Sequence, residues 1–100
     1  MPGHFDYLIV GAGFAGLTMA ERLCCGSGKP CLIVERRDHI GGNSYDSHDD
    51  HGVLVHNYGP HYFRTNAPQI AEYLGQFTAW HPVGYKILSF IDGRYWNFPV

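Results

Sequence analysis

Residues 7–16 read Tyr-Leu-Ile-Val-Gly-Ala-Gly-Phe-Ala-Gly, and this stretch decides the fold. Its apolar first half predicts a short buried strand over residues 5–10, because it is rich in residues that favour strands. A helical pattern follows over residues 15–24, and a second apolar strand is expected over residues 31–34. The order strand, glycine turn, helix, strand predicts a βαβ unit with parallel strands, and therefore an α/β, Rossmann-like dinucleotide-binding domain.

The glycines of this turn have the spacing of a dinucleotide-binding fingerprint, Gly11-x-Gly13-x-x-Gly16. The first glycine permits a tight turn, the second lets a pyrophosphate approach the backbone, and the third lets helix and strand pack closely. Free N–H groups at the start of the helix favour the negative charge of the pyrophosphate. Glu35 comes 19 residues after Gly16, where an acid binds the adenosine ribose hydroxyls and disfavours the 2′-phosphate of NADP.

A second pair of glycines, Gly41-Gly42, follows this acid and is itself followed by Asn43. Such a pair lets another backbone segment approach an extended cofactor, and Asn43 can donate and accept hydrogen bonds beside it. The alternative is a plain surface turn in which the neighbouring arginines are solvated. Residues 36–52 as a whole are polar and predict a long loop with one helical turn, before a strand over residues 53–56.

The last third of the chain contains signals for a helix and a hairpin. Asn66 is a plausible N-cap, with Pro68 in the first turn of a helix that continues to about residue 76. The dipeptide at positions 92–93 is Asp-Gly, which predicts a β-hairpin between the apolar stretches 85–91 and 94–98.

Composition bounds the kind of protein. The chain has 100 residues, 45% of them hydrophobic, and a formal net charge of -2, which suits one partial domain over residues 1–100 and makes nucleic acid an unlikely partner. We see no apolar run long enough to span a membrane and no signal peptide. Cys24, Cys25 and Cys31 are odd in number and include no spaced pair, which favours a reducing, cytoplasmic location.

Three blocks together closely resemble the start of the UDP-galactopyranose mutases. They are Ile-Val-Gly-Ala-Gly-Phe-Ala-Gly, Val-Glu-Arg-Arg-Asp-His-Ile-Gly-Gly-Asn-Ser-Tyr, and His-Asn-Tyr-Gly-Pro-His-Tyr-Phe-Arg-Thr-Asn, which begin at positions 9, 34 and 56. Many flavoproteins share the first block, but the second and third at this spacing are more specific. The resemblance runs over residues 7–100 and implies that the chain is the N-terminal portion of a larger FAD enzyme.

The resemblance also implies roles for individual residues. It assigns the FAD pyrophosphate to the first glycine turn, that is to Gly11, Gly13, Phe14, Ala15 and Gly16. It assigns the adenosine ribose to Glu35 with Arg36 beside it, and the pyrophosphate and ribityl region to Gly42 and Asn43. It puts His61 and Tyr62 against the flavin ring, with His61 as the catalytic residue.

The resemblance further implies a reaction. In this family reduced flavin N5 attacks the anomeric carbon of UDP-galactopyranose, UDP is displaced, and recyclisation gives UDP-galactofuranose. The enzyme would be an isomerase of cell wall polysaccharide biosynthesis, with a nucleotide-sugar substrate whose UDP is gripped by residues further downstream. The resemblance leaves open whether the full-length protein is a homo-oligomer.

Two departures from the family pattern keep other functions open. Tyr62 stands where relatives have an aliphatic residue, and Arg64 stands where they have a histidine. An FAD-dependent amine oxidase or desaturase shares the opening fingerprint but usually has an arginine in place of Asn43. A non-catalytic dinucleotide-binding fragment is the third possibility. No metal is expected, because the cluster His-Asp-Asp-His over residues 48–51 lies in a hydrophilic turn without helical spacing.

Overall fold

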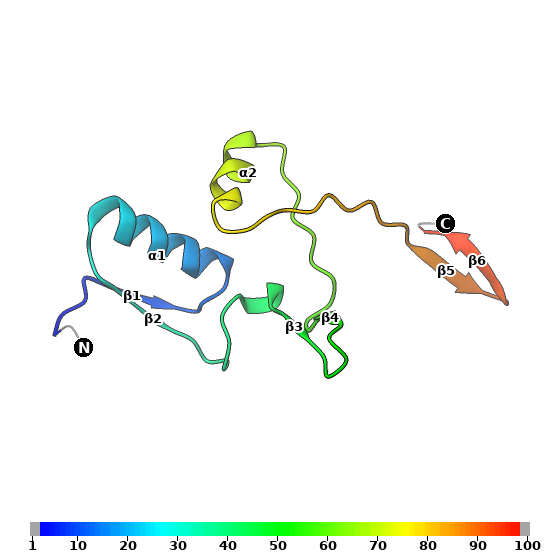
Figure 1. Cartoon of the computed structure of the whole chain (residues 1–100), viewed down its shortest axis with the longest axis horizontal. Helices are drawn as coiled ribbons and strands as arrows, with labels where there is room; N and C mark the ends of the chain where they lie inside the picture. Colours follow the sequence, from blue (N-terminus) through cyan, green and yellow to red (C-terminus); the bar gives the residue numbers. More distant parts are fainter. Residues whose placement is uncertain (1–2, 99–100) are drawn as a thin grey trace. The chain divides into compact units, whose positions relative to one another are not determined.

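The structure, a computed structural model, describes residues 3–98 and divides the chain into two compact units, Met1–Phe63 and Arg64–Val100 (Figure 1). The elements in chain order are β1 (Tyr7–Val10), α1 (Phe14–Ser27), β2 (Cys31–Val34), the 3-10 turn η1 (Gly42–Ser44), β3 (Asp46–His48), β4 (Leu54–His56), α2 (Pro68–Gly75), β5 (Leu88–Ile91) and β6 (Arg94–Asn97).

The predicted βαβ unit is confirmed. Strands β1 and β2 pair in parallel, with Tyr7 opposite Cys31 and Val10 opposite Val34, and α1 connects them. The helix is longer than predicted because it continues to the glycine that can end it. Gly28 adopts the left-handed conformation, with φ of 68°, and its N–H donates to the carbonyl of Cys24.

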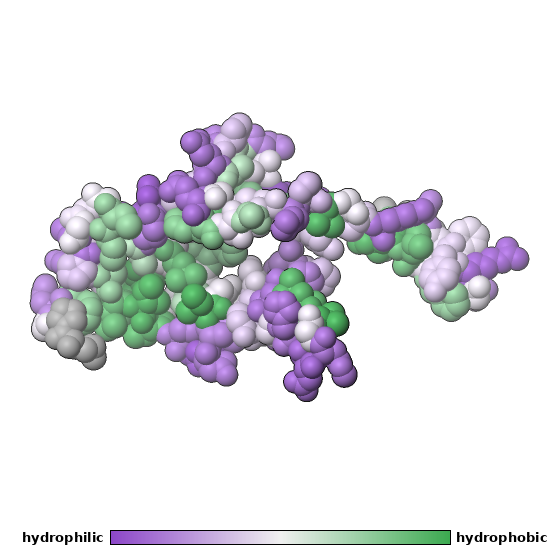
Figure 2. Space-filling view, in the orientation of Figure 1, coloured by the Kyte–Doolittle hydropathy of each residue, from purple (hydrophilic) through white to green (hydrophobic). Residues whose placement is uncertain are grey.

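Helix α1 covers one face of the β1–β2 sheet (Figure 1). Along each strand, half-buried and exposed residues alternate, as expected when one face packs against a helix. Ala20 on the helix is 8% exposed. On the opposite face the apolar side chains remain exposed, to 64% at Leu8 and 80% at Val10. Figure 2 shows apolar residues gathered over this unit.

The loop predicted over residues 36–52 is more ordered than expected. It contains the anticipated helical turn, η1, but also a strand, β3, that pairs antiparallel with β4. Its sequence, Asp-Ser-His, has low strand propensity, so pairing with β4 forms this strand rather than a local preference. Asp49 closes the hairpin, because its Oδ1 accepts the N–H groups of His51 and Val53 at 2.8 and 2.9 Å.

In the second unit, the prediction that Asn66 caps α2 is wrong. Pro68 is the first residue of the helix, so the N-cap position falls on Ala67, which makes no side-chain capping bond. The turn before the helix is stabilised instead by Thr65, whose hydroxyl oxygen accepts the N–H of Ala67 at 3.1 Å.

The predicted hairpin is confirmed in the second unit. Strands β5 and β6 are antiparallel, with Ile91 opposite Arg94. Asp92 and Gly93 both have positive φ, 50° and 73°, as a two-residue type I′ turn requires. Within residues 3–98, neither helix has the length and apolar character that crossing a membrane would demand.

The close approach of Gly16 to the glycine turn gives a first prediction. A Cβ at Gly16 would lie 2.0 Å from the carbonyl oxygen of Gly11, a backbone atom that cannot yield easily. We expect Gly16→Ala to lower the free energy of unfolding of the full-length protein by about 1–3 kcal/mol. The matched control is Gly26→Ala on the same helix, where a Cβ would meet nothing within 4 Å. It should raise stability by up to about 1 kcal/mol. Equal effects of the two variants in urea titrations would contradict the packing role.

Candidate functional site

The first part of the site is the glycine turn between β1 and α1. Gly11 has φ of +102°, and its N–H donates to the carbonyl of Val34 at 2.7 Å, so the turn is fastened to the end of β2. Gly13 is the N-cap of α1, where no side chain forms a capping bond and no acidic residue occupies the first turn. The first N–H groups of a helix have no partner within it, so this end can receive an anion.

The second part is the Gly41-Gly42 segment, which lies directly against the first turn. The N–H of Gly41 donates to the carbonyl of Ala12 at 2.7 Å. A Cβ at Gly42 would lie 3.1 Å from the Cα of Gly13. Both Gly41 and Gly42 have positive φ, 97° and 60°. The two segments therefore meet through backbone atoms, and a side chain at Gly42 would push them apart.

Glu35 joins the two strand ends through its carboxylate. Its Oε2 accepts the N–H of Ala12 at 2.6 Å, and its Oε1 accepts the N–H of Arg37 at 2.9 Å. These bonds, first that from Arg37 and then that from Ala12, hold the pKa of the Glu35 carboxyl below its ordinary value. The acid predicted to bind a ribose thus also fastens the glycine turn, a role that sequence spacing does not reveal.

The two arginines after Glu35 point to different surroundings. Arg36, the one expected beside the ribose, is exposed, whereas Arg37 is half-buried. The guanidinium of Arg37 donates to Oδ1 of Asn43 at 2.9 Å and lies 4.2 Å from the ring centre of Tyr58. Sequence reasoning missed Arg37 and Tyr58 at the site. Only the alternation of a chain continuing from a strand could have indicated which arginine turns inward.

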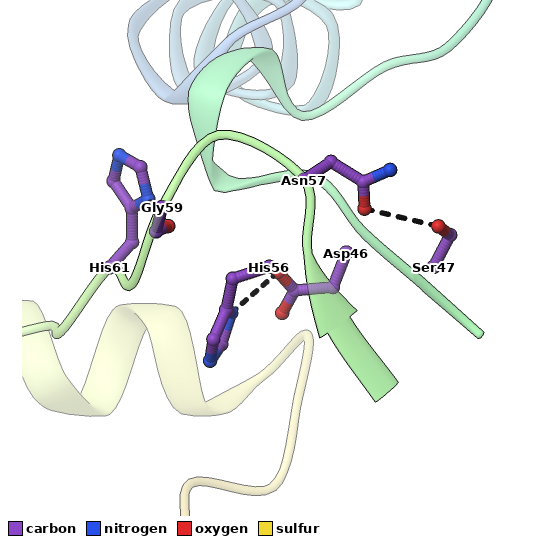
Figure 3. Close-up of polar contacts among 6 residues, drawn as sticks. All are labelled: Asp46, Ser47, His56, Asn57, Gly59 and His61. Atoms are coloured by element: carbon purple, nitrogen blue, oxygen red, sulfur yellow. Dashed lines mark hydrogen bonds and ion pairs between the residues drawn. The ribbon is translucent and has the colours of Figure 1, made fainter. Parts of the chain in front are cut away.

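The remaining predicted residues, His61 and Tyr62, follow β4 along the chain, and Figure 3 shows His61 on this segment. His61 is exposed and folds back, with its Nδ1 2.6 Å from the carbonyl oxygen of Gly59. Tyr62 is 46% exposed. The contacts at the glycine turn therefore bring together both glycine segments, Glu35 and Asn43, whereas the contact of His61 is to Gly59.

Two side-chain contacts join β3 to the end of β4 and to the residue after it (Figure 3). Nδ1 of His56 lies 2.7 Å from Oδ1 of Asp46, its partner in the β3–β4 register. One residue further along, the hydroxyl of Ser47 donates to Oδ1 of Asn57 at 3.0 Å. These contacts fix where the segment carrying His61 begins.

The match to a protein family agrees with this geometry. Residues 9–77 match the model described as an NAD(P)-binding Rossmann-like domain, a range that includes both glycine segments and Glu35. The chain therefore belongs to the NAD(P)-binding Rossmann-like domain family, and a dinucleotide is the class of cofactor that this membership implies.

Comparison with curated proteins confirms the resemblance to sugar-nucleotide mutases. The chain is 39% identical over 96 residues to a probable UDP-galactopyranose mutase of Klebsiella pneumoniae, which covers 95% of this chain and 25% of that protein. It is 44% identical over 93 residues to the UDP-galactopyranose mutase of Mycoplasma genitalium, covering 88% and 23%. It is 35% identical over 94 residues to the dTDP-fucopyranose mutase of Escherichia coli, covering 93% and 25%.

The chain spans about a quarter of the length of these relatives. Shorter matches reach an (S)-6-hydroxynicotine oxidase of Paenarthrobacter nicotinovorans, over 73% of this chain, and a phytoene desaturase of Pseudescherichia vulneris, over 42%. Proteins of several named activities therefore match parts of this chain.

The lowered pKa of Glu35 predicts a pH dependence of stability. Its stabilising contribution is complete above the ordinary value of 4.5 and is lost as the pH falls through the lower value of the folded state. We expect the stability difference between the full-length protein and its Glu35→Gln variant to be constant from neutral pH down to 4.5 and to shrink below that pH. Urea titrations across that range measure the difference, and Glu72→Gln on exposed α2 is the control. A difference that stays constant in acid would contradict the assignment.

Proposed function

We propose that this chain is the FAD-binding part of a flavin-dependent isomerase that interconverts UDP-galactopyranose and UDP-galactofuranose. The observation that carries the proposal is the contact between Gly13 and Gly42, which joins two side-chain-free segments beside the uncapped start of α1. The names of the relatives supply the reaction, and the contact supplies a reason for an extended dinucleotide.

The described residues fit FAD at its two phosphates and at its adenosine ribose. The bare backbone at Gly13 and Gly42 leaves room for a pyrophosphate, and the helix N-terminus attracts its charge. Glu35 uses part of its acceptor capacity on the N–H groups of Ala12 and Arg37. An ionised carboxylate has about four acceptor positions, so the others can take ribose hydroxyls. Asn43, held by Arg37, would flank the pyrophosphate and ribityl region.

When bound and reduced, the flavin would supply the nucleophile, its N5 atom, to the anomeric carbon of the sugar. This part of the chain would bind and orient the cofactor. His61 holds a proton on Nδ1, because the carbonyl oxygen of Gly59 can only accept. Its Nε2 is then an acceptor. We place His61, with Tyr62 beside it, at the flavin ring.

A second candidate is an FAD-dependent oxidoreductase, and the shorter matches to an oxidase and a desaturase favour it. The two candidates differ in whether the substrate is oxidised. Turnover of UDP-galactopyranose by the full-length protein with dithionite as reductant supports the isomerase, and reduction of bound flavin by an amine or a polyene supports the oxidoreductase. The dTDP-fucopyranose mutase among the relatives makes dTDP-fucopyranose the comparison substrate. We infer a cytoplasmic enzyme, since Cys24, Cys25 and Cys31 are all unpaired thiols.

The role of Glu35 at the ribose can be separated from its role in the glycine turn. If the carboxylate binds ribose hydroxyls, the full-length protein should bind ADP about tenfold more tightly than 2′-deoxy-ADP, and Glu35→Ala should abolish this preference. If Glu35 only fastens the turn, the variant weakens both ligands equally and the preference persists. Calorimetric titration of both nucleotides, with Glu72→Ala as control, decides between the two.

The role of His61 is tested by comparing turnover with cofactor content. We expect His61→Ala to lower turnover of UDP-galactopyranose by roughly a hundredfold, the low end of what a proton-transferring group contributes. FAD content should change little, because the contacts at Gly13, Gly42 and Glu35 remain. The control is His51→Ala in the exposed β3–β4 turn, which should leave both quantities unchanged. Parallel loss of flavin and turnover in His61→Ala would show that the residue only stabilises its segment.

A further inference from the structure

His39 is held by three groups at once. Its Nε2 lies 2.7 Å from the hydroxyl of Tyr58, and its Nδ1 lies 3.0 Å from the carbonyl oxygen of Ile40. Its ring stacks on Tyr45, with the centroids 3.8 Å apart and the planes 14° from parallel. The side chain is half-buried. A histidine with both nitrogens and one face in contact is fixed in position, although nothing in the proposed reaction uses it.

The partners of His39 determine which nitrogen bears the proton. The carbonyl of Ile40 can only accept, so Nδ1 donates to it. In the neutral ring Nε2 is then an acceptor, and the hydroxyl of Tyr58 donates to it. The bond therefore has a defined direction, from Tyr58 to His39, and loss of the tyrosine hydroxyl would leave Nε2 without this donor.

Tyr58 is linked through other side chains to residues on both sides of the second glycine segment. Through His39 it reaches the residues just before Gly41-Gly42. Through its ring, on which the guanidinium of Arg37 lies, it reaches Asn43, since Arg37 donates to the Asn43 side chain. Residues on both sides of the glycine pair are therefore connected to each other through the Tyr58 side chain.

The backbone of the glycine pair has to be held in place by contacts outside the pair. Gly41 and Gly42 both have positive φ. Because glycine has no side chain, its backbone has more conformational freedom than that of any other residue type. Toward the first turn they are held by the bond from Gly41 to the carbonyl of Ala12 and by the close approach of Gly42 to Gly13. Both contacts depend on the backbone staying where the flanking side chains put it.

We propose that Tyr58 and His39 are positioning residues that hold the Gly41-Gly42 segment against the first glycine turn. Tyr58 precedes His61 by only three positions, so the segment that carries His61 and the segment that borders the dinucleotide are fastened to each other. The positioning role of Tyr58 and His39 is inferred from these contacts alone, whereas its effect on FAD binding rests on the proposed function.

The test uses variants that keep the rings and remove the hydrogen bond. Tyr58→Phe retains the ring beneath Arg37, and His39→Phe retains a ring that can stack on Tyr45. In the cofactor-free full-length protein, we expect the Gly41 amide to exchange with solvent about three to ten times faster in either variant. The control is Tyr95→Phe, which removes a tyrosine hydroxyl from a side chain that is 72% exposed. Exchange at the wild-type rate in both variants would overturn the proposal.

A double-mutant cycle adds the functional readout. Each single variant should raise the dissociation constant of FAD about three- to tenfold. The dissociation constant of the double variant should not exceed that of the single variant that binds FAD more weakly. Effects that multiply in the double variant would mean that the residues act independently, which overturns the link between them. If the wild-type protein does not bind FAD, the proposed function fails, while amide exchange at Gly41 still decides the positioning role. If one variant does not fold, the other provides the exchange measurement.

Discussion

The carboxylate of Glu35 makes the contact on which the rest of the first unit depends. It accepts the N–H of Ala12, which follows β1, and the N–H of Arg37, which follows β2. Because parallel strands end at the same edge of a sheet, one carboxylate can join both chain segments there, and that edge is where α/β proteins bind ligands. Ala12 is only 1% exposed, so no water replaces its bond easily. These bonds, with that from Gly11 to the carbonyl of Val34, hold the first glycine turn in position.

Around this contact, glycines without side chains let backbone segments approach one another closely. Gly16 lets α1 pack on the turn, and Gly42 lets a second segment approach Gly13. Such a surface suits a ligand that is recognised by backbone N–H groups, as a pyrophosphate is. The glycines of this surface have high backbone conformational freedom. Polar and aromatic side chains outside the surface restrict that freedom. Arg37, His39 and Tyr58 therefore belong to the site although none is needed to touch the ligand.

Where local signals and tertiary contacts agreed, prediction succeeded. The βαβ unit and the Asp92-Gly93 hairpin were predicted because an apolar run, a glycine spacing and a turn dipeptide each favour one backbone conformation. Where a polar stretch gains its structure from a partner, prediction failed. Strand β3 exists because β4 lies beside it, and the cap of α2 fell on Ala67 because Pro68 occupies the first helical position.

The sequence by itself determined the class of the domain and the two glycine segments, since spacing along the chain records what each turn must do. The family resemblance added His61 and Tyr62, which no spacing pattern had singled out together as a site. Only the tertiary structure decided that Glu35 fastens the first turn and that Tyr58 bonds to His39. The bond from Ala12 to Glu35 joins residues 23 positions apart and the bond between Tyr58 and His39 joins residues 19 positions apart, and no local pattern encodes such a meeting.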